Sequence, residues 1–152
     1  MRTTKVRLLP NPFAAPETVN LSVSPDLIGP GPSDNRLYVV NPKQAKIPYQ
    51  YPDLPPFTGT QQYLAINPKQ MASLSIDHPS FIAVHLYGVT RFVLDVWEYY
   101  FGHSIPWWFH EHYSRLELVT QADFHNAHCG YGYLETGYSC LLYTSPSPRD
   151  PE

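Results

Sequence analysis

Two short segments of this chain gather the side chains that bind metals or act as bases. The first is His110-Glu111-His112. Zinc peptidases carry H-E-x-x-H on a helix, where two histidines four residues apart share one face. Here Ser114 stands four residues after His110, so the triplet lacks that spacing. We therefore expect it to form an exposed polar turn.

The second segment combines His125, His128, Cys129 and, further on, Glu135. Imidazole, thiolate and carboxylate groups are all ligands that zinc accepts. Cys129 beside a histidine could instead act as a nucleophile with its base. Glycines follow at once, so we expect a polar loop over a groove and assign no catalytic or metal-binding residue. A metal-binding domain built directly on these four residues is the alternative.

A long helix precedes these segments and must position them. Asp77 is an acidic cap candidate, Pro79 suits a first turn, and Gly102 is a natural stop. These signals predict a helix over about residues 78–101. Apolar residues recur at three- and four-residue spacing, at Ile82, Leu86, Val89, Val93, Val96, Trp97 and Tyr100.

The polar residues of this helix, Arg91, Asp95 and Glu98, fall largely on the face opposite the apolar stripe. Phenylalanines at 81, 92 and 101 widen the stripe. We therefore expect the helix to be more buried than an ordinary surface helix.

Short strands follow the helix. Residues 115–120 alternate like a half-buried strand, residues 122–130 are expected to be a loop, and residues 131–136 form a second strand that ends at Gly137. A long helix followed by a two- or three-stranded partial sheet is an α+β pattern. We expect an incomplete domain of this class over residues 77–139.

The first half of the chain differs in character. Residues 1–76 hold twelve of the seventeen prolines, which excludes long helices there. The segments 5–9, 37–40 and 63–66 are candidate short strands. The pattern predicts a proline-rich, short-stranded unit, either a loosely strapped extended arm or a small β-rich subdomain.

The end of the chain has an unusual composition. Residues 140–150 resemble a translated sequencing adapter, so we expect residues 140–152 to be an artefactual tail. Residues 1–139 would then be the N-terminal part of a longer protein, whose core should leave an apolar face bare.

The net charge of −3 predicts neither a nucleic-acid footprint nor a membrane-surface patch. We expect a cytoplasmic protein.

The order of elements is similar to one protein family. A helix ending in Tyr-Phe-Gly102, a strand at 116–119, the pair Asn126-Ala127 and an aromatic, glycine-rich strand at 131–138 resemble the region before the zinc helix of thermolysin-like (gluzincin) metallopeptidases. The resemblance implies that Asn126 and Ala127 start the edge strand of a cleft and bind an extended peptide substrate by strand addition, with Tyr131 nearby.

In that family the H-E-x-x-H helix and a downstream glutamate helix come after such a strand. The resemblance therefore implies a catalytically incomplete chain without a cofactor, with zinc and the peptide substrate belonging to the complete enzyme. The alternative is a non-enzymatic binding or structural protein with an aromatic-rich interaction surface. Twelve tyrosines, seven phenylalanines and three tryptophans favour that alternative.

Overall fold

The computed structural model describes residues 2–11, 13–42, 46–59, 61–62 and 65–137. The expected tail at 140–152 lies outside the described residues, as do Tyr63 and Leu64 of the predicted strand at 63–66.

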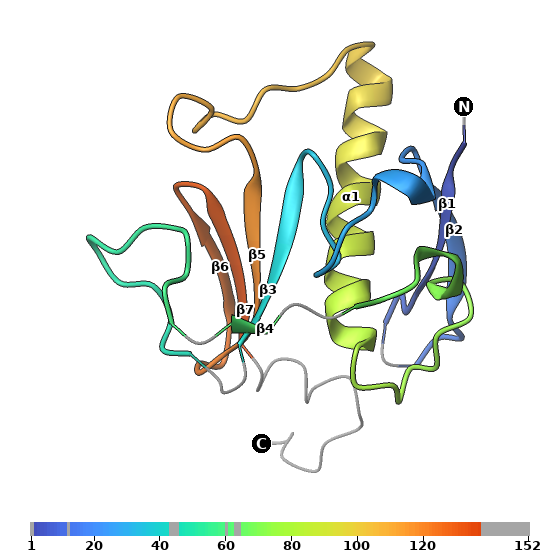
Figure 1. Cartoon of the computed structure of the whole chain (residues 1–152), viewed down its shortest axis with the longest axis horizontal. Helices are drawn as coiled ribbons and strands as arrows, with labels where there is room; N and C mark the ends of the chain where they lie inside the picture. Colours follow the sequence, from blue (N-terminus) through green and yellow to red (C-terminus); the bar gives the residue numbers. More distant parts are fainter. Residues whose placement is uncertain (1, 12, 43–45, 60, 63–64, 138–152) are drawn as a thin grey trace.

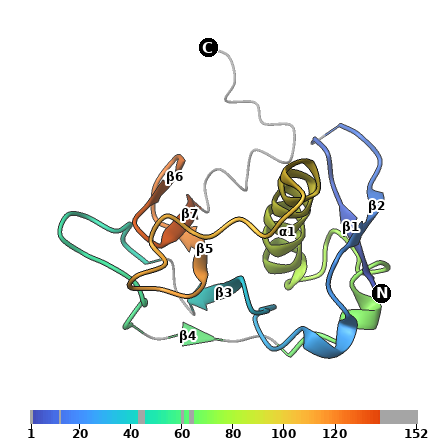
Figure 2. The same ribbon diagram turned by 90° about the horizontal axis from the view of Figure 1, so that it is seen from above.

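The helix lies between two sheets, an arrangement that Figures 1 and 2 show from perpendicular directions. The first sheet pairs β1 (Thr4–Leu8) with β2 (Glu17–Leu21). The second comprises β3 (Leu37–Pro42), β4 (Gln61–Gln62), β5 (Leu116–Ala122), β6 (Ala127–Gly130) and β7 (Tyr133–Gly137). The helix α1 spans Phe81–Phe101, and two 3-10 turns, η1 (Pro25–Leu27) and η2 (Pro68–Gln70), lie in the connections.

The strands of the larger sheet follow the order β4-β3-β5-β7-β6. The central strands β3, β5 and β7 are parallel, and the outer strands β4 and β6 are antiparallel to their neighbours. One long helix with mixed, partial sheets confirms the predicted α+β class. The strand β3 lies in the proline-rich half and pairs with β5 from the second half.

The limits of α1 follow from its ends. Gly102 adopts a left-handed conformation with φ of 76°, and its N–H donates to Glu98 O, so the helix stops where predicted. The start differs slightly from the prediction. Residues 77–80 form turns in which His78 N donates to Ser75 O and Ser80 N to His78 Nδ1, so the helix begins at Phe81.

The prediction for residues 122–130 was wrong in its second half, because residues 127–130 form the strand β6. The strand β2 was not predicted. Glu17 and Asn20 of β2 are exposed and only Leu21 is fully buried, so this strand shows little of the alternation that marks a strand in a sequence.

The core fills the space between α1 and the two sheets. Gly88 lies where α1 meets β1: a Cβ there would lie 2.9 Å from Leu8 Cδ2, so a larger residue would require the packed side chains or the helix to shift. Twelve buried residues form one cluster: Val6, Leu8, Leu21, Val23, Leu37, Val39, Met71, Ala83, Val84, Tyr87, Leu94 and Leu118.

A buried polar network connects α1 to the segment that leads into β3. Asp34 Oδ2 accepts hydrogen bonds from Tyr87 OH at 2.6 Å and from Arg91 at 3.1 Å. Its other oxygen accepts the backbone N–H groups of Arg36 and Leu37. Burial, followed by the charge of Asp34, raises the pKa of Tyr87, which keeps the phenol protonated as a donor.

A second ion pair lies further along the helix. Arg36 contacts Glu98 Oε2 at 2.5 Å, with both side chains largely buried. Burial opposes the ionisation of Glu98, but the hydrogen bond from Ile105 N at 2.8 Å and the Arg36 pair together lower its pKa. Glu98 therefore carries its negative charge across the neutral range.

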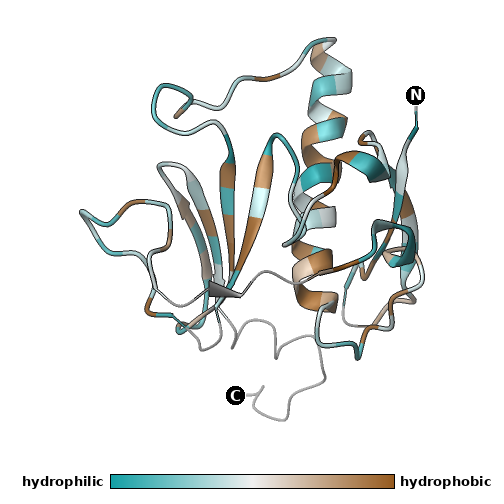
Figure 3. Cartoon of the chain, viewed as in Figure 1, coloured by the Kyte–Doolittle hydropathy of each residue, from teal (hydrophilic) through white to brown (hydrophobic). Residues whose placement is uncertain are grey.

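The charged residues of α1 were expected on the face opposite the buried stripe, and this was wrong. Arg91 is buried at the core, and Asp95 and Glu98 are engaged by Arg91 and Arg36. Conversely, much of the predicted stripe is exposed, together with its neighbours. We define the outer face of α1 as these exposed residues: Val89, Val93, Val96, Trp97, Tyr99, Tyr100 and Phe101. Hydrophobic segments occur along the whole helix in Figure 3.

We predict that Asp34→Ala destabilises the fold by about 3–5 kcal/mol, because it leaves the buried Arg91 without one partner and three further donors without an acceptor. Urea unfolding followed by tryptophan fluorescence measures the change. The matched control is Asp26→Ala, whose ion pair with Arg2 is exposed and should contribute less than about 1 kcal/mol. Equal losses in the two variants would contradict a special role for Asp34.

Candidate functional site

The strand β6 places the residues that the sequence singled out for substrate binding. Asn126 directly precedes β6 and Ala127 is its first residue. In the strand order, β6 is the last strand and pairs only with β7 among the described strands. Its second edge therefore offers backbone groups that no described strand uses.

Backbone hydrogen bonds fix which groups of β6 point to that edge. In an antiparallel pair, facing residues alternate between pairs that exchange backbone hydrogen bonds and pairs that do not. Gly137 N donates to Asn126 O at 2.7 Å, so the alternation starts there. His128 then directs its backbone groups toward β7, whereas Ala127 and Cys129 direct theirs to the edge.

The side chain of Asn126 covers one of these edge groups. Its Oδ1 accepts the N–H of Ala127 at 2.8 Å. The carbonyl of Ala127 and both backbone groups of Cys129 are then the groups that remain for an added strand. Gly137 makes this local geometry possible, because a Cβ there would lie 1.8 Å from Phe124 O.

Behind the edge lies the sheet face that points away from α1, and it carries two fully buried carboxylates. Glu117 of β5 and Glu135 of β7 are both 0% exposed. The register places Tyr38, Glu117 and Tyr133 side by side on this face, with Glu135 two residues further along β7. The proline-rich segment 46–59 covers them, and Figures 1 and 2 both show it on the side of the sheet opposite α1.

The segment 46–59 satisfies both carboxylates. Glu117 accepts hydrogen bonds from Tyr38 OH at 3.0 Å, Tyr49 OH at 2.7 Å and Phe57 N at 2.9 Å. Tyr49 also donates its backbone N–H to Glu135 at 2.9 Å, so one residue bridges the two acids. Burial, and next the hydrogen bond to Glu117, raise the pKa of Tyr49.

Of the two buried carboxylates, Glu135 is the one paired with a charged side chain. It forms a salt bridge with Lys46, whose side chain is 6% exposed, and the ammonium lies 3.4 Å from the centre of the Tyr49 ring. Its second oxygen lies 2.7 Å from His128 Nε2. The sequence missed this network. A glutamate in the middle of each of two apolar parallel strands is the signal for it, because such strands bury charge only with partners.

The network reaches β6 through His128, whose side chain is 35% exposed. The ring of Tyr133 lies 5.6 Å from the ring of His128, and that of Phe124 lies 5.1 Å away. His128 is thus held from three sides. The arrangement fixes the position of β6 rather than opening a reactive group to solvent.

The metal site considered for His125, His128, Cys129 and Glu135 is not assembled. Among the residues that the structure describes, no three His, Cys, Asp or Glu side chains could hold one ion. Neighbours on a strand point to opposite faces, so Cys129 and His128 diverge. The same geometry separates the thiol from a His128 base.

Tyr131 lies at the far end of β6 from Asn126, in the turn before β7, so the two residues are not adjacent. Its ring contacts those of Trp108 at 4.8 Å, Phe109 at 6.0 Å and Tyr113 at 6.0 Å. The hydroxyl group lies 2.6 Å from His112 Nδ1. The structure therefore places Tyr131 at the centre of an aromatic cluster.

The triplet His110-Glu111-His112 forms an exposed turn beside this cluster, as predicted. Trp108 of the same turn is 71% exposed.

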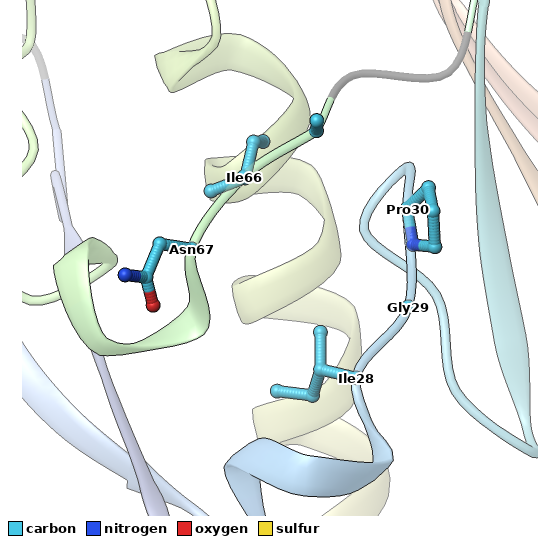
Figure 4. Close-up of a pocket in the computed structure, with 6 residues that line it drawn as sticks. Ile28, Gly29, Pro30, Ile66 and Asn67 are labelled. Atoms are coloured by element: carbon cyan, nitrogen blue, oxygen red, sulfur yellow. The ribbon is translucent and has the colours of Figure 1, made fainter.

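A separate open pocket of about 300 Å³ lies away from β6, between the residues after η1 and those before η2 (Figure 4). It is lined by Ile28, Gly29, Pro30, Ala65, Ile66 and Asn67. These residues have no titratable side chain, and Asn67 Oδ1 accepts the N–H of Lys69. The lining of the pocket therefore holds no side chain that could act as an acid, a base or a nucleophile.

Comparisons with protein-family models, curated proteins and solved structures gave no match for this chain. Within the described residues, no helix is both long and apolar enough to cross a membrane.

We predict that Glu135→Leu destabilises the protein by about 3–5 kcal/mol and releases the segment 46–59, because Lys46 is left buried without its carboxylate. The double variant Glu135→Leu/Lys46→Met should recover much of the loss, since it removes the unpaired charge. Urea unfolding and the rate of proteolysis within residues 46–59 measure both effects. Additive losses in the double variant would show that the ion pair does not hold this segment.

Proposed function

We propose that this chain is the N-terminal part of a zinc metallopeptidase-like protein and that β6 is its peptide-binding edge. The proposal joins the family resemblance to one observation. The pair Asn126-Ala127 starts the last strand of the sheet, where backbone groups point outward. An extended peptide can bond to such an edge as an added strand.

The buried network behind β6 supports this role. Strand addition gains affinity when the receiving strand is already in its bound conformation, because no ordering is then needed. The side chain of His128 is tied to Glu135, and Glu135 is tied to Lys46. The edge of β6 is therefore anchored to the interior of the sheet.

The aromatic cluster around Tyr131 lies at the other end of the same edge. A peptide laid along β6 would extend over about 17 Å between Asn126 and Tyr131, at the usual rise per residue. Its side chains could then contact Tyr131 and the exposed Trp108. The three residues predicted to bind substrate would contact one extended ligand at different positions.

The described residues do not supply a zinc site, since they hold no suitable cluster of three ligand side chains. In this proposal the metal, its ligands and the glutamate base belong to other parts of the complete enzyme. The role of the present chain is to bind and align the peptide.

We expect extended peptides to bind the chain and Cys129→Pro to abolish that binding. Proline removes an N–H that points to the free edge, whereas the β6–β7 ladder uses that of His128. The matched control, Cys129→Ala, keeps the N–H and should bind as the native chain does. Isothermal titration with a mixture of unstructured peptides measures the effect. Equal binding by both variants would mean that peptides do not add to β6.

Recovery of the coding locus beyond the Ser139 codon tests the family assignment independently. We expect an H-E-x-x-H helix within about thirty residues, followed by a glutamate helix. A reading frame that continues without these ligands would remove the peptidase and leave the edge of β6 as a peptide-binding site without catalysis.

A second candidate function is that of a non-enzymatic binding protein. The observation that favours it is the set of exposed aromatic rings, with Trp97 exposed by 54%, Tyr100 by 76% and Trp108 by 71%. Exposed tryptophan and tyrosine residues are typical of interfaces. Under this function the complete protein would show no metal dependence, and its tryptophan fluorescence would respond to a partner.

A further inference from the structure

We propose that the outer face of α1 pairs with the same face of a second copy of this chain, giving a two-fold symmetric dimer with antiparallel helices. The proposal goes beyond the peptide edge of β6 and does not rest on it. It rests on the charge, the area and the shape of the outer face.

The outer face is uncharged along its whole length. The helix contains three formal charges, Arg91, Asp95 and Glu98, and the body of the protein engages all of them. Its histidine, His85, contacts Leu9 O, and burial lowers its pKa, which favours the neutral form. A charged partner would lose hydration against such a face without gaining an ion pair. A second copy presents an equally uncharged surface, so nothing is left unpaired.

The size of the outer face suits a dimer. An aromatic side chain buries about 150–250 Å². Trp97, Tyr100 and Phe101, which share one side of the helix, are exposed by 54%, 76% and 57%, which corresponds to roughly 300–450 Å². With the exposed parts of three valines, the area reaches the lower end of a standard interface, which is roughly 600 Å² per partner. A bare apolar patch of this size is at the upper end of what monomers expose.

The distribution of side-chain sizes favours an antiparallel arrangement. Val89, Val93, Trp97 and Phe101 recur every four residues along this face, with the two valines toward the start of the helix and the two aromatic residues toward its end. A two-fold axis midway between Val93 and Trp97 brings Trp97 of one copy opposite Val93 of the other. Phe101 then lies opposite Val89, since each residue faces the one equally distant on the other side of the axis. Large side chains then pack on small ones at both ends.

A lipid surface suits this face less well. Helices that lie in a membrane interface carry lysine or arginine beside the apolar face, where these residues contact anionic headgroups. The single arginine of α1, Arg91, is buried against Asp34 on the opposite side of the helix. The helix therefore lacks the cationic flank that such binding uses.

The test is sedimentation equilibrium on the whole chain and on charge variants at the centre of the outer face. We expect the native chain to form dimers. Val93→Lys and Val93→Glu should each raise the dimer dissociation constant at least about a hundredfold, because two like charges then lie close together on either side of the axis. A mixture of the two variants should restore dimers, since the charges are then opposite. Tyr51→Lys, at a 100% exposed site outside α1, is the matched control and should dimerise as the native chain does.

Three results would overturn the proposal. One is a native chain that remains monomeric at its highest soluble concentration. Another is a dimer, or an open-ended aggregate, that Val93→Lys leaves unchanged. The third is a mixture of Val93→Lys and Val93→Glu that stays monomeric. Co-sedimentation with neutral phosphatidylcholine vesicles, lost in Val93→Lys while the free chain is monomeric, would assign the face to lipid instead.

Discussion

Two ion pairs between α1 and the entry to β3 determine how the layers of this protein are arranged. Arg91 reaches Asp34 and Arg36 reaches Glu98, and both pairs are largely buried. Removing either partner of such a pair leaves an uncompensated charge in the interior. The orientation of α1 about its own axis is fixed by these pairs, and so is the side of the helix that remains in solvent.

This orientation explains where the sequence succeeded and where it misled. The three- and four-residue spacing of apolar residues located the helix, and Gly102 located its end, because both signals are local in the sequence. The inward face was not predictable from hydrophobicity, since the partners of Arg91 and Glu98 lie 57 and 62 residues away in the chain. Tyr87 and Arg91 are inside because Asp34 is there to bind them. Val93 and Trp97 remain outside as a result.

The same limit applies to the candidate site. Asn126 and Ala127 could be singled out from the sequence through a family resemblance, and they lie at the start of an edge strand. The strand itself was mistaken for a loop, because Ala127 and Gly130 are poor strand formers that pairing with β7 holds in place. The acids behind it depend on Lys46, 89 residues before Glu135, and no local pattern predicts such a partner.

The parallel pairing of β3 with β5 has a consequence for how the chain folds. Tyr38 and Glu117, which face each other across this pair, are 79 residues apart in the sequence. Closing a loop of that length costs entropy before any contact compensates for it, so pairs of this kind form late and slowly. During synthesis, β3 leaves the ribosome well before its neighbour exists. The hairpin of β1 and β2 is complete earlier, and α1 is the next element that it can pack against. The centre of the larger sheet is therefore among the last parts of the molecule to assemble.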